Sequence, residues 1–396
     1  MGELPATAWL NTLLSLLQAA QVGLLDGLQR LGLAQESHGQ PAWPWAFRVS
    51  GENLLIDMGQ ARQLAVSLLL AGLAVVLLPV ALLLFKRFRR SAAAVAGLAI
   101  ALVVFAPWPD AHVVLVPADP TSFHRSPTGF TARSVVAGGR VYAAQCVACH
   151  GADGRGEGPA AAAQPVWPPD LAGPLLWRRA DGDLFWRIRH GLRDRHGATT
   201  MAGFGDRLSD TETWAVIDYL KAQAAGQSLR RNGAWERPVA APDFLVRCDG
   251  MPPRPLSDWR SRHQRLRLVA EGAAAPPLED PRLATVLLRS GDGAATGAAS
   301  GIDCTADSPD AWQALALMAG SPPGAFAGTQ LIADRDGWLR ARGEPGRAGW
   351  SDDDLLCRTG TTRPRTGTTA AADGLGSLLA RMDAEPVRFV KGGFVH

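Results

Sequence analysis

The most uniform hydrophobic stretch of this 396-residue chain runs from Leu64 to Phe85, and no charged side chain interrupts it. As a helix, this stretch is about 33 Å long at a rise of 1.5 Å per residue, which is enough to cross the hydrocarbon core of a membrane. A second apolar run, from Ala92 to Ala106, ends at a Pro-Trp-Pro sequence. The pattern therefore predicts membrane-spanning helices near residues 64–85 and 92–108.

A third apolar segment, near residues 8–30, carries a polar stripe at helical spacing that includes Asn11, Ser15 and Gln18. Such a segment either spans the membrane with its stripe against other helices or lies flat at the membrane surface. No positively charged segment precedes it, so we do not expect a cleaved signal peptide. We favour the spanning alternative. With three spans the N-terminus starts in the cytoplasm, whereas with two spans about 60 N-terminal residues would have to cross the membrane without a signal peptide.

A basic loop lies between the two stronger spans and contains Lys86, Arg87, Arg89 and Arg90. Positive charges beside membrane helices are concentrated on the cytoplasmic side, so the outer flanks of both spans are expected on the opposite side. The sequence thus predicts a membrane domain over residues 1–115 in the inner (cytoplasmic) membrane. The rest of the chain is then expected on the periplasmic side.

The remainder of the chain divides into a linker and two predicted domains. Residues 116–130 are rich in Pro, Ser and Thr, as linkers are. Residues 131–226 predict an all-α domain, with helices over 133–146 and 183–190 and a last helix that begins at a capping box, Ser209 to Glu212.

Residues 238–396 alternate between strand and helix patterns, which is typical of an α/β layer fold. Strands are expected near residues 265–270, 284–289, 329–334 and 338–341, and helices near residues 309–319, 352–358 and 375–383. A loose loop is expected over residues 358–373, because that segment is rich in Thr, Gly and Arg.

Composition adds two constraints. A net charge of +3, with no basic run that suggests nucleic-acid binding, gives no sign of a nucleic-acid partner. Only five cysteines are present, which excludes a disulfide-rich scaffold.

Residues 146–150 read Cys-Val-Ala-Cys-His, the attachment signature of a c-type haem. Two thiols on one helical turn can each form a thioether with a vinyl group of one porphyrin, and the adjacent imidazole then lies under the iron. A zinc site would need a second ligand pair at similar spacing, which the remaining, isolated cysteines do not supply. The sequence therefore predicts one covalent haem c held by Cys146, Cys149 and His150.

Met201 is the only methionine within residues 131–226 and lies in a loop beside glycines, before the last predicted helix. A thioether suits the sixth coordination position of haem iron, where it favours the ferrous state. Filling a gap in the core is the alternative role. His190 and His196 compete for the iron, but His190 follows an apolar helix and His196 lies among charged residues. We therefore predict Met201 as the sixth ligand.

The haem motif, the Met-Ala-Gly-Phe sequence at 201–204 and the final Trp- and Tyr-containing helix resemble class I cytochromes c over nearly all of residues 131–226. The resemblance implies His/Met ligation and a carbonyl from Pro168 or Pro169 that orients His150. The junction from Pro120 to Phe130, with membrane segments before it, is also similar to copper-resistance-D-type proteins fused to cytochrome modules.

The sequences at 241–244 and 331–340 resemble redoxins of the thioredoxin superfamily. Where those proteins carry redox cysteines, this chain has a cysteine-free segment at 271–277. Because thiol–disulfide exchange needs a thiol nucleophile, the resemblance implies a degenerate thioredoxin-like domain with a docking or structural role. A bridge, a buried thiol and a metal ligand remain open for each of Cys248, Cys304 and Cys357.

Together these features predict a membrane-anchored c-type cytochrome that carries single electrons on the periplasmic side and is not by itself an enzyme. The expected partners are redox proteins of a respiratory chain, and a larger membrane complex is a further possibility. Two alternatives stay open. One is catalysis or gas sensing at a haem with an open sixth position. The other is copper handling beside histidines near the membrane, such as His38 and His112.

Overall fold

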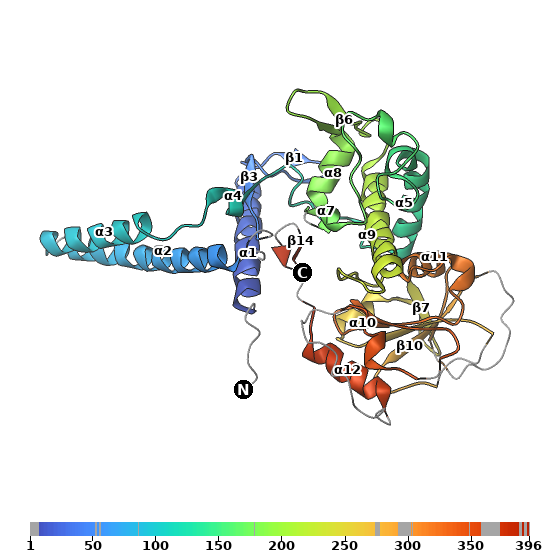
Figure 1. Ribbon diagram of the computed structural model, residues 1–396. Helices are drawn as coiled ribbons and strands as arrows, with labels where there is room; N and C mark the ends of the chain where they lie inside the picture. Colours follow the sequence, from blue (N-terminus) through green and yellow to red (C-terminus); the bar gives the residue numbers. More distant parts are fainter. Residues whose placement is uncertain are drawn as a thin grey trace. The chain divides into compact units, whose positions relative to one another are not determined.

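The structure is a computed structural model, and its residues fall into two compact units (Figure 1). One unit comprises residues 1–123 with 390–396, and the other comprises residues 124–389. The structure describes residues 8–51, 54, 57–85, 87–177, 179–273, 278–291, 302, 304–347, 349–357, 373–387, 390–391 and 394–395.

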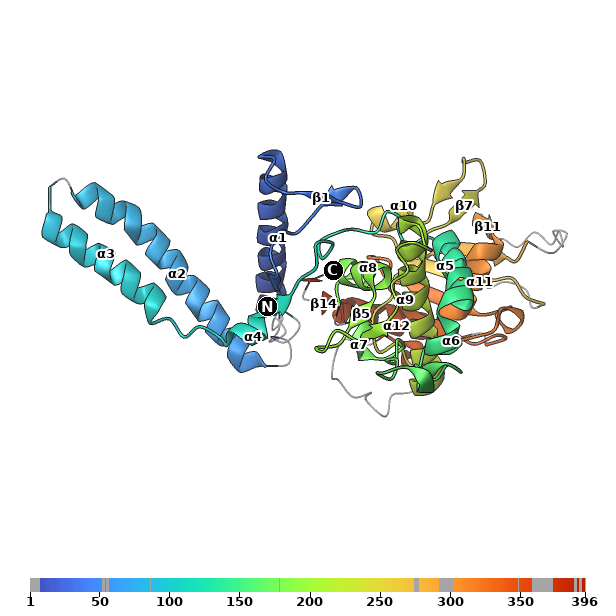
Figure 2. The same ribbon diagram turned by 90° about the horizontal axis from the view of Figure 1, so that it is seen from above.

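Three helices dominate the first unit: α1 (Ala8–Arg30), α2 (Met58–Phe85) and α3 (Arg89–Val104). Helices α2 and α3 lie side by side as a hairpin in both views (Figures 1 and 2). Among the described helices, α2 alone has the length and mean hydropathy of a membrane span. It therefore confirms a helix over the strongest predicted span, while the crossing of the membrane by α1 and α3 stays a prediction.

Short strands join the segments on either side of this hairpin. Strand β3 (Phe47–Val49) pairs antiparallel with β4 (Leu115–Pro117), which follows the short helix α4 (Ala111–Val114). The chain that enters α2 and the chain that leaves α3 are thus joined at the same end of the hairpin. Two further strand pairs belong to this unit: β1 (Glu36–Ser37) with β2 (Gln40–Pro41), and β14 (Val390–Lys391) with β15 (Phe394–Val395).

The second unit begins with the predicted helical domain. Its elements are α5 (Ala132–Gln145), α6 (Val147–His150), the 3-10 turn η1 (Ala161–Ala163), α7 (Pro174–Trp177), α8 (Asp181–His190), β5 (Leu192–Arg193), β6 (Thr199–Met201) and α9 (Asp210–Asn232). The predicted capping box is confirmed at the start of α9, because the Ser209 hydroxyl accepts from the Glu212 amide and the Glu212 carboxylate accepts from the Ser209 amide.

Helices α5 and α9 cross in close contact. A Cβ atom placed on Gly138 would lie 1.9 Å from the carbonyl oxygen of Ala215, so a side chain there is excluded. The glycine pair at 138–139 weakens the helix intrinsically. The close approach of the α9 backbone explains why a glycine stands at position 138.

A seven-stranded sheet with the order β13-β12-β9-β10-β11-β7-β8 forms the rest of the unit. Its strands are β7 (Leu245–Cys248), β8 (Arg254–Pro255), β9 (Leu266–Ala270), β10 (Ala284–Arg289), β11 (Cys304–Asp307), β12 (Gln330–Ala333) and β13 (Leu339–Gly343). Strands β9, β10 and β11 are parallel, and the other neighbouring pairs are antiparallel. The α/β fold is confirmed, and β7, β8 and β11 are additions to the four predicted strands. The thioredoxin-like assignment stays a prediction.

Alternating side chains of the sheet form two cores. Leu331 and Ala333 pack into the core that contains α11 (Pro309–Met318), whereas Ile332 packs with α12 (Gly374–Ala384). A third, short helix, α10 (Ser257–Ser261), follows β8. The alternation places α11 and α12 on opposite faces of the sheet (Figure 1).

The helix predicted over 352–358 is wrong within the described residues. Only a 3-10 turn, η3 (Asp352–Asp354), forms there. Leu355 bridges to Ala341 of β13, and the amides of Leu356 and Cys357 donate to the Arg340 carbonyl, so the chain is extended where a helix was expected. The loop predicted over 358–373 lies, apart from its last residue, outside the described residues.

The predicted boundary between the helical and α/β domains is not a free linker. Val135 of α5, Leu229 of α9 and Leu315 of α11 belong to one apolar core that continues into the sheet. Trp235, in the connecting segment, is 1% exposed, and its indole nitrogen donates to the Met318 carbonyl at 3.0 Å. Residues 124–389 therefore fold as one unit.

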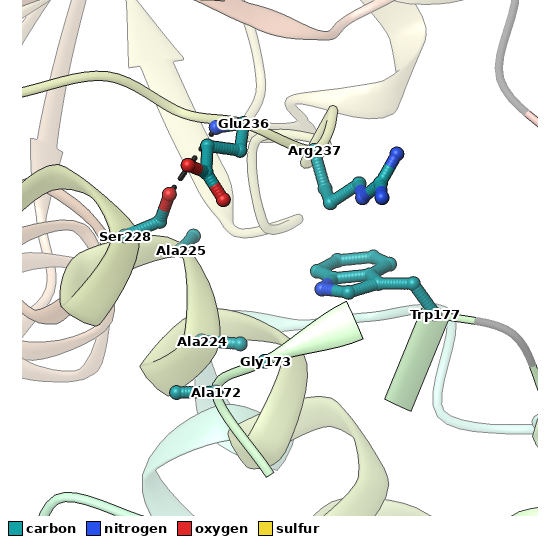
Figure 3. Close-up of a pocket in the computed structure, with 8 residues that line it drawn as sticks. All are labelled: Ala172, Gly173, Trp177, Ala224, Ala225, Ser228, Glu236 and Arg237. Atoms are coloured by element: carbon teal, nitrogen blue, oxygen red, sulfur yellow. Dashed lines mark hydrogen bonds between the residues drawn. The ribbon is translucent and has the colours of Figure 1, made fainter. Parts of the chain in front are cut away.

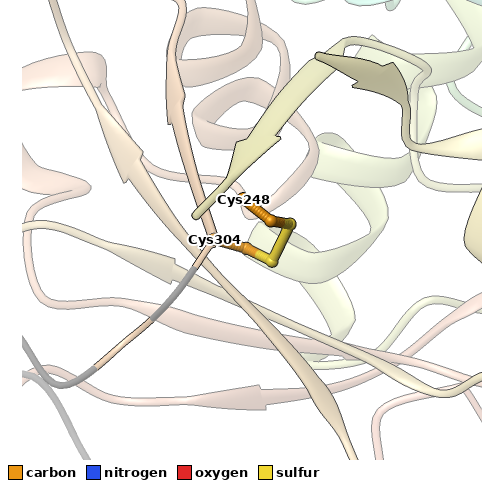
Figure 4. The surroundings of a disulfide bond; sticks show 2 residues. All are labelled: Cys248 and Cys304. Carbon is orange, nitrogen blue, oxygen red and sulfur yellow. A yellow bond between two sulfur atoms is a disulfide. The ribbon is translucent and has the colours of Figure 1, made fainter. Parts of the chain in front are cut away.

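Cys248 and Cys304 form a disulfide between β7 and β11, where they are direct partners in the strand register (Figure 4). Cys357 is a free, buried thiol, and burial raises its pKa to about 11. A thiol in that state is a poor nucleophile and a poor metal ligand at neutral pH. The three possibilities for these cysteines thus resolve into one bridge and one inert thiol.

Candidate haem site

The haem-binding motif lies where α5 ends and α6 begins. Cys146 is both the C-cap of α5 and the N-cap of α6. Cys149 and His150 complete the single turn of α6. Both thiols are free, although this chain forms a disulfide elsewhere. Burial, and then the neighbouring Cys149, raises the pKa of Cys146 to about 11. The structure thus places two cysteines with no disulfide between them and an imidazole on one helical turn, as haem attachment requires.

The loop that follows α6 clasps it through the backbone. The amide of Gly156 donates to the His150 carbonyl at 2.9 Å, and that of Gly158 donates to the Cys149 carbonyl at 3.1 Å. A Cβ atom on Gly158 would lie 2.4 Å from the Ala148 carbonyl oxygen, so only glycine allows this approach. These backbone bonds hold the glycine-rich segment 151–159 against the haem-binding turn.

The environment of His150 favours a neutral imidazole. Burial lowers the pKa of His150, and a backbone interaction with Pro169 raises it in part. Its Nδ1 atom is buried and has no hydrogen bond of ordinary geometry among the described residues, so we treat Pro169 as a neighbouring acceptor rather than a formed bond. A neutral ring with an acceptor near Nδ1 leaves Nε2 for the metal. The residues present therefore fit a c-type haem, and Pro169 as the group that orients His150 stays a prediction.

An apolar wall lies beside the motif. Cys146 and Val147 pack against a cluster that includes Tyr142, Leu176 and Trp177. The Tyr142 hydroxyl donates at 2.8 Å to the carbonyl of Gly151, the residue directly after His150. No sequence pattern predicts this bond of Tyr142, because the bond depends on the turn between α5 and the loop.

Met201 lies on a separate element, the β5–β6 hairpin, where it pairs with Leu192 and is half-buried. The following loop is anchored to the end of α8: the amide of Gly205 donates to the Arg189 carbonyl, and the Arg189 guanidinium donates to the carbonyls of Gly205 and Leu208. The loop is therefore held by several bonds to α8. Ligation of iron by Met201 stays a prediction.

The competing histidines have other contacts. His190 stacks on Trp186 with ring centroids 3.6 Å apart, and its Nδ1 lies 3.0 Å from the Trp186 carbonyl oxygen. His196 is exposed in the turn between β5 and β6. Within the described part of the chain, no group of three or more His, Cys, Asp or Glu side chains gathers as a metal site, and His38 and His112 are exposed.

A small cavity of about 160 Å³ lies beside Trp177, between α9 and the segment that leads to the sheet (Figure 3). Figure 3 shows the Ser228 hydroxyl bonded to the Glu236 amide at its edge. Cofactor pockets are typically larger, roughly 300–1,000 Å³. This cavity is therefore not the haem site.

Asp218 ties the segment before α5 to the helical core. Its Oδ2 atom accepts hydrogen bonds from the hydroxyls of Thr128 at 2.5 Å and Ser134 at 2.6 Å. The residue is 1% exposed, and burial raises its pKa above 3.8, although Lys221 opposes the shift. A carboxyl group with a raised pKa in the folded state lowers the free energy of unfolding as pH rises from 3.8 through that raised pKa.

Replacing Asp218 with Asn removes this titration while keeping an acceptor for Thr128 and Ser134. The variant is therefore expected to lose less stability than the wild type as pH rises through that window. Urea unfolding followed by haem absorbance at several pH values measures the difference. Parallel pH curves for the two proteins would contradict the assignment, and Asp206→Asn, at an exposed position, provides the control.

Residues 133–220 form a c-type cytochrome domain, because this segment also matches the family model described as cytochrome c oxidase, cbb3-type, subunit III. The chain is similar to the Cbb3-type cytochrome c oxidase subunit CcoP of Azospirillum sp. (strain B510), with 30% identity over an alignment of 159 residues, and the match covers 36% of this chain and 46% of that protein. The chain thus spans less than half the length of this relative.

A chain of the reducing HAO-like protein complex of Kuenenia stuttgartiensis shows 26% identity over 32% of this chain and 59% of that chain, with a TM-score of 0.22, which carries no argument. The family match and the CcoP relative, with the haem-binding turn and α2, support a membrane-associated, haem-containing electron-transfer cytochrome.

Proposed function

We propose that this chain is a membrane-anchored periplasmic cytochrome that carries single electrons through one covalently bound haem. The observation that carries the proposal is the haem-binding turn itself: two free thiols and a half-buried imidazole on α6, clasped by the glycine loop. The sequence contains one such motif, which supports one haem.

Each residue of the site has a defined task. Haem c supplies a one-electron couple at its iron. Cys146 and Cys149 would hold the group, and His150, kept neutral by burial, would ligate the iron. Met201, on the β5–β6 hairpin, would supply the other ligand. An iron with both ligands would leave no position for a substrate, so the chain would transfer electrons and would not be an enzyme alone.

The compartment follows from the chemistry of the cysteines. The Cys248–Cys304 bridge belongs to an oxidising environment, as does the attachment of haem c outside the cytoplasm. Both features lie in the unit of residues 124–389, so they share one side of the membrane. The basic loop around Arg87 then lies on the cytoplasmic side. These arguments support the inner membrane with a periplasmic haem domain.

We further propose that the chain serves as an electron-transfer component of a larger membrane oxidoreductase. The similarity to a cbb3-type oxidase subunit supports this partner class. Redox proteins of a respiratory chain are then the donors and acceptors.

Carbon monoxide binding to the reduced protein tests the closed iron. Wild type is expected to bind none, whereas Met201→Ala is expected to bind it readily, since a thioether no longer occupies the sixth position. Optical spectra of the haem measure binding, and His196→Ala serves as the control because His196 is exposed. Ready binding by wild type would overturn the carrier proposal in favour of catalysis or gas sensing.

A further inference from the structure

Helix α1 has one buried face and one exposed apolar face. Leu10, Leu14 and Leu25 are 0%, 1% and 4% exposed and form the buried face. Trp9, Leu16 and Leu24, on a neighbouring face, are 38%, 63% and 49% exposed. Their spacing of seven and eight residues keeps them within one side of a helix.

A third face of α1 is polar. It contains Asn11, Ser15 and Asp26, and Ser15 and Asp26 are exposed. The Ser15 hydroxyl donates to the carbonyls of Asn11 and Thr12 within the helix. An exposed apolar face beside an exposed polar face is the pattern of a helix at a membrane surface.

The buried face packs near the start of α2. Leu10 and Leu14 belong to one cluster with Ala61 and Leu64, which lie in the first turns of α2, and with Val114 of α4. Because β3 and β4 join the segments that flank the hairpin, this is also the end of the hairpin where the chain enters α2 and leaves α3.

The middle of α1 is bonded to this small sheet. The Gln21 amide nitrogen donates to the Val49 carbonyl at 3.1 Å, and the Val49 amide donates to the Gln21 carboxamide oxygen at 2.8 Å. Val49 lies in β3, which belongs to an open, two-stranded sheet. Open sheet edges do not occur within the hydrocarbon of a membrane, because their backbone groups would lack partners. The middle of α1 is therefore outside the hydrocarbon core.

We infer that α1 lies flat on the membrane, with the face formed by Trp9, Leu16 and Leu24 in the lipid, at the surface where α2 begins. A spanning helix would place its middle, and with it the bonded strand β3, at the bilayer centre, where the open edges of a sheet would lack hydrogen-bond partners. Aromatic side chains at the same end of the hairpin support this level: Trp45, Phe47 and Trp108 are 46%, 55% and 45% exposed, as expected of interfacial anchors. The inference replaces three crossings with two and rests on α2 crossing the membrane, independently of haem ligation.

Single spin labels on the full chain in vesicles of phosphatidylcholine and phosphatidylglycerol test this placement. Labels replace Trp9, Leu16 or Leu24 on the apolar face and Ser15 or Asp26 on the polar face, in a Cys357→Ala background. Collision rates with oxygen and with a water-soluble nickel complex report depth. The apolar-face labels are expected at one shallow depth, and the polar-face labels are expected in water.

Each other result overturns the inference. A label at position 16 that lies much deeper than those at 9 and 24, with position 15 shielded from nickel, would show a spanning helix. Apolar-face labels shielded from both reagents would show contact with protein. A label at Leu69, in the middle of α2, is expected to be deep, and a water-exposed result there would remove the premise that α2 crosses. An unchanged helix content, measured by circular dichroism, confirms folding in each variant.

Discussion

Replacing Gly226 with Ala is expected to destabilise the protein, although the same change in an open helix would stabilise it. Alanine is the better helix former by about 1 kcal/mol. In α9, however, the added Cβ atom would lie 1.9 Å from the carbonyl oxygen of Leu317 in α11. Neither backbone can move freely, because both helices belong to the core that joins them to the sheet. Overpacking of this kind costs about 1–3 kcal/mol.

Urea unfolding followed by haem absorbance and by tryptophan fluorescence measures this effect. Thr211→Ala, at an exposed position of the same helix, is the control and is expected to change stability by less than about 0.5 kcal/mol. Because α9 serves both the haem domain and the α/β domain, the two probes are expected to report one transition at a lower urea concentration. A stabilised Gly226→Ala protein, or two separate transitions in wild type, would contradict the shared core.

The sequence predicts best those features that depend on neighbours along the chain. The capping box at Ser209, the haem motif at 146–150 and the strands near 266–270 and 284–289 are all local patterns, and the structure contains each of them. A glycine within a helix, such as Gly138, costs stability and so indicates a close neighbour. The pattern does not identify that neighbour, which is Ala215 of α9.

Features that depend on contacts between distant parts of the chain were not predicted. A helix at 352–358 was plausible from its residues, but Leu355 pairs with Ala341 and tertiary pairing prevails over local propensity. The backbone bonds from Gly156 and Gly158 to α6 could not be predicted, because composition does not indicate them. The core shared by the helical and α/β parts also depends on distant residues, so the sequence did not predict it. Helix α9 continues to Asn232, beyond the predicted boundary at residue 226, and Trp235 is buried against α11.

Removal of the Cys248–Cys304 bridge is expected to have a comparably large effect. The bridge closes a loop of 56 residues between β7 and β11. In the chain-entropy account, a bridge across a loop of that length stabilises the folded state by about 4 kcal/mol. A double variant, Cys248→Ala with Cys304→Ala, is therefore expected to unfold at a clearly lower urea concentration than the oxidised wild type.

A thiol reductant gives the matched comparison, because thioether bonds to haem are not reduced by thiols. With the haem iron kept ferrous by ascorbate in every sample, the thiol reductant is expected to lower the stability of wild type towards that of the double variant and to leave the double variant unchanged. Equal stability of the oxidised wild type and the double variant would contradict a stabilising bridge. Since β7 pairs with β11 and lies next to β8 at the sheet edge, the loss is expected to appear first there, as faster amide exchange in β7 than in β9. A chain kept in a reducing compartment would thus lack the bridge, so the stability of the α/β part depends on the redox state of its surroundings.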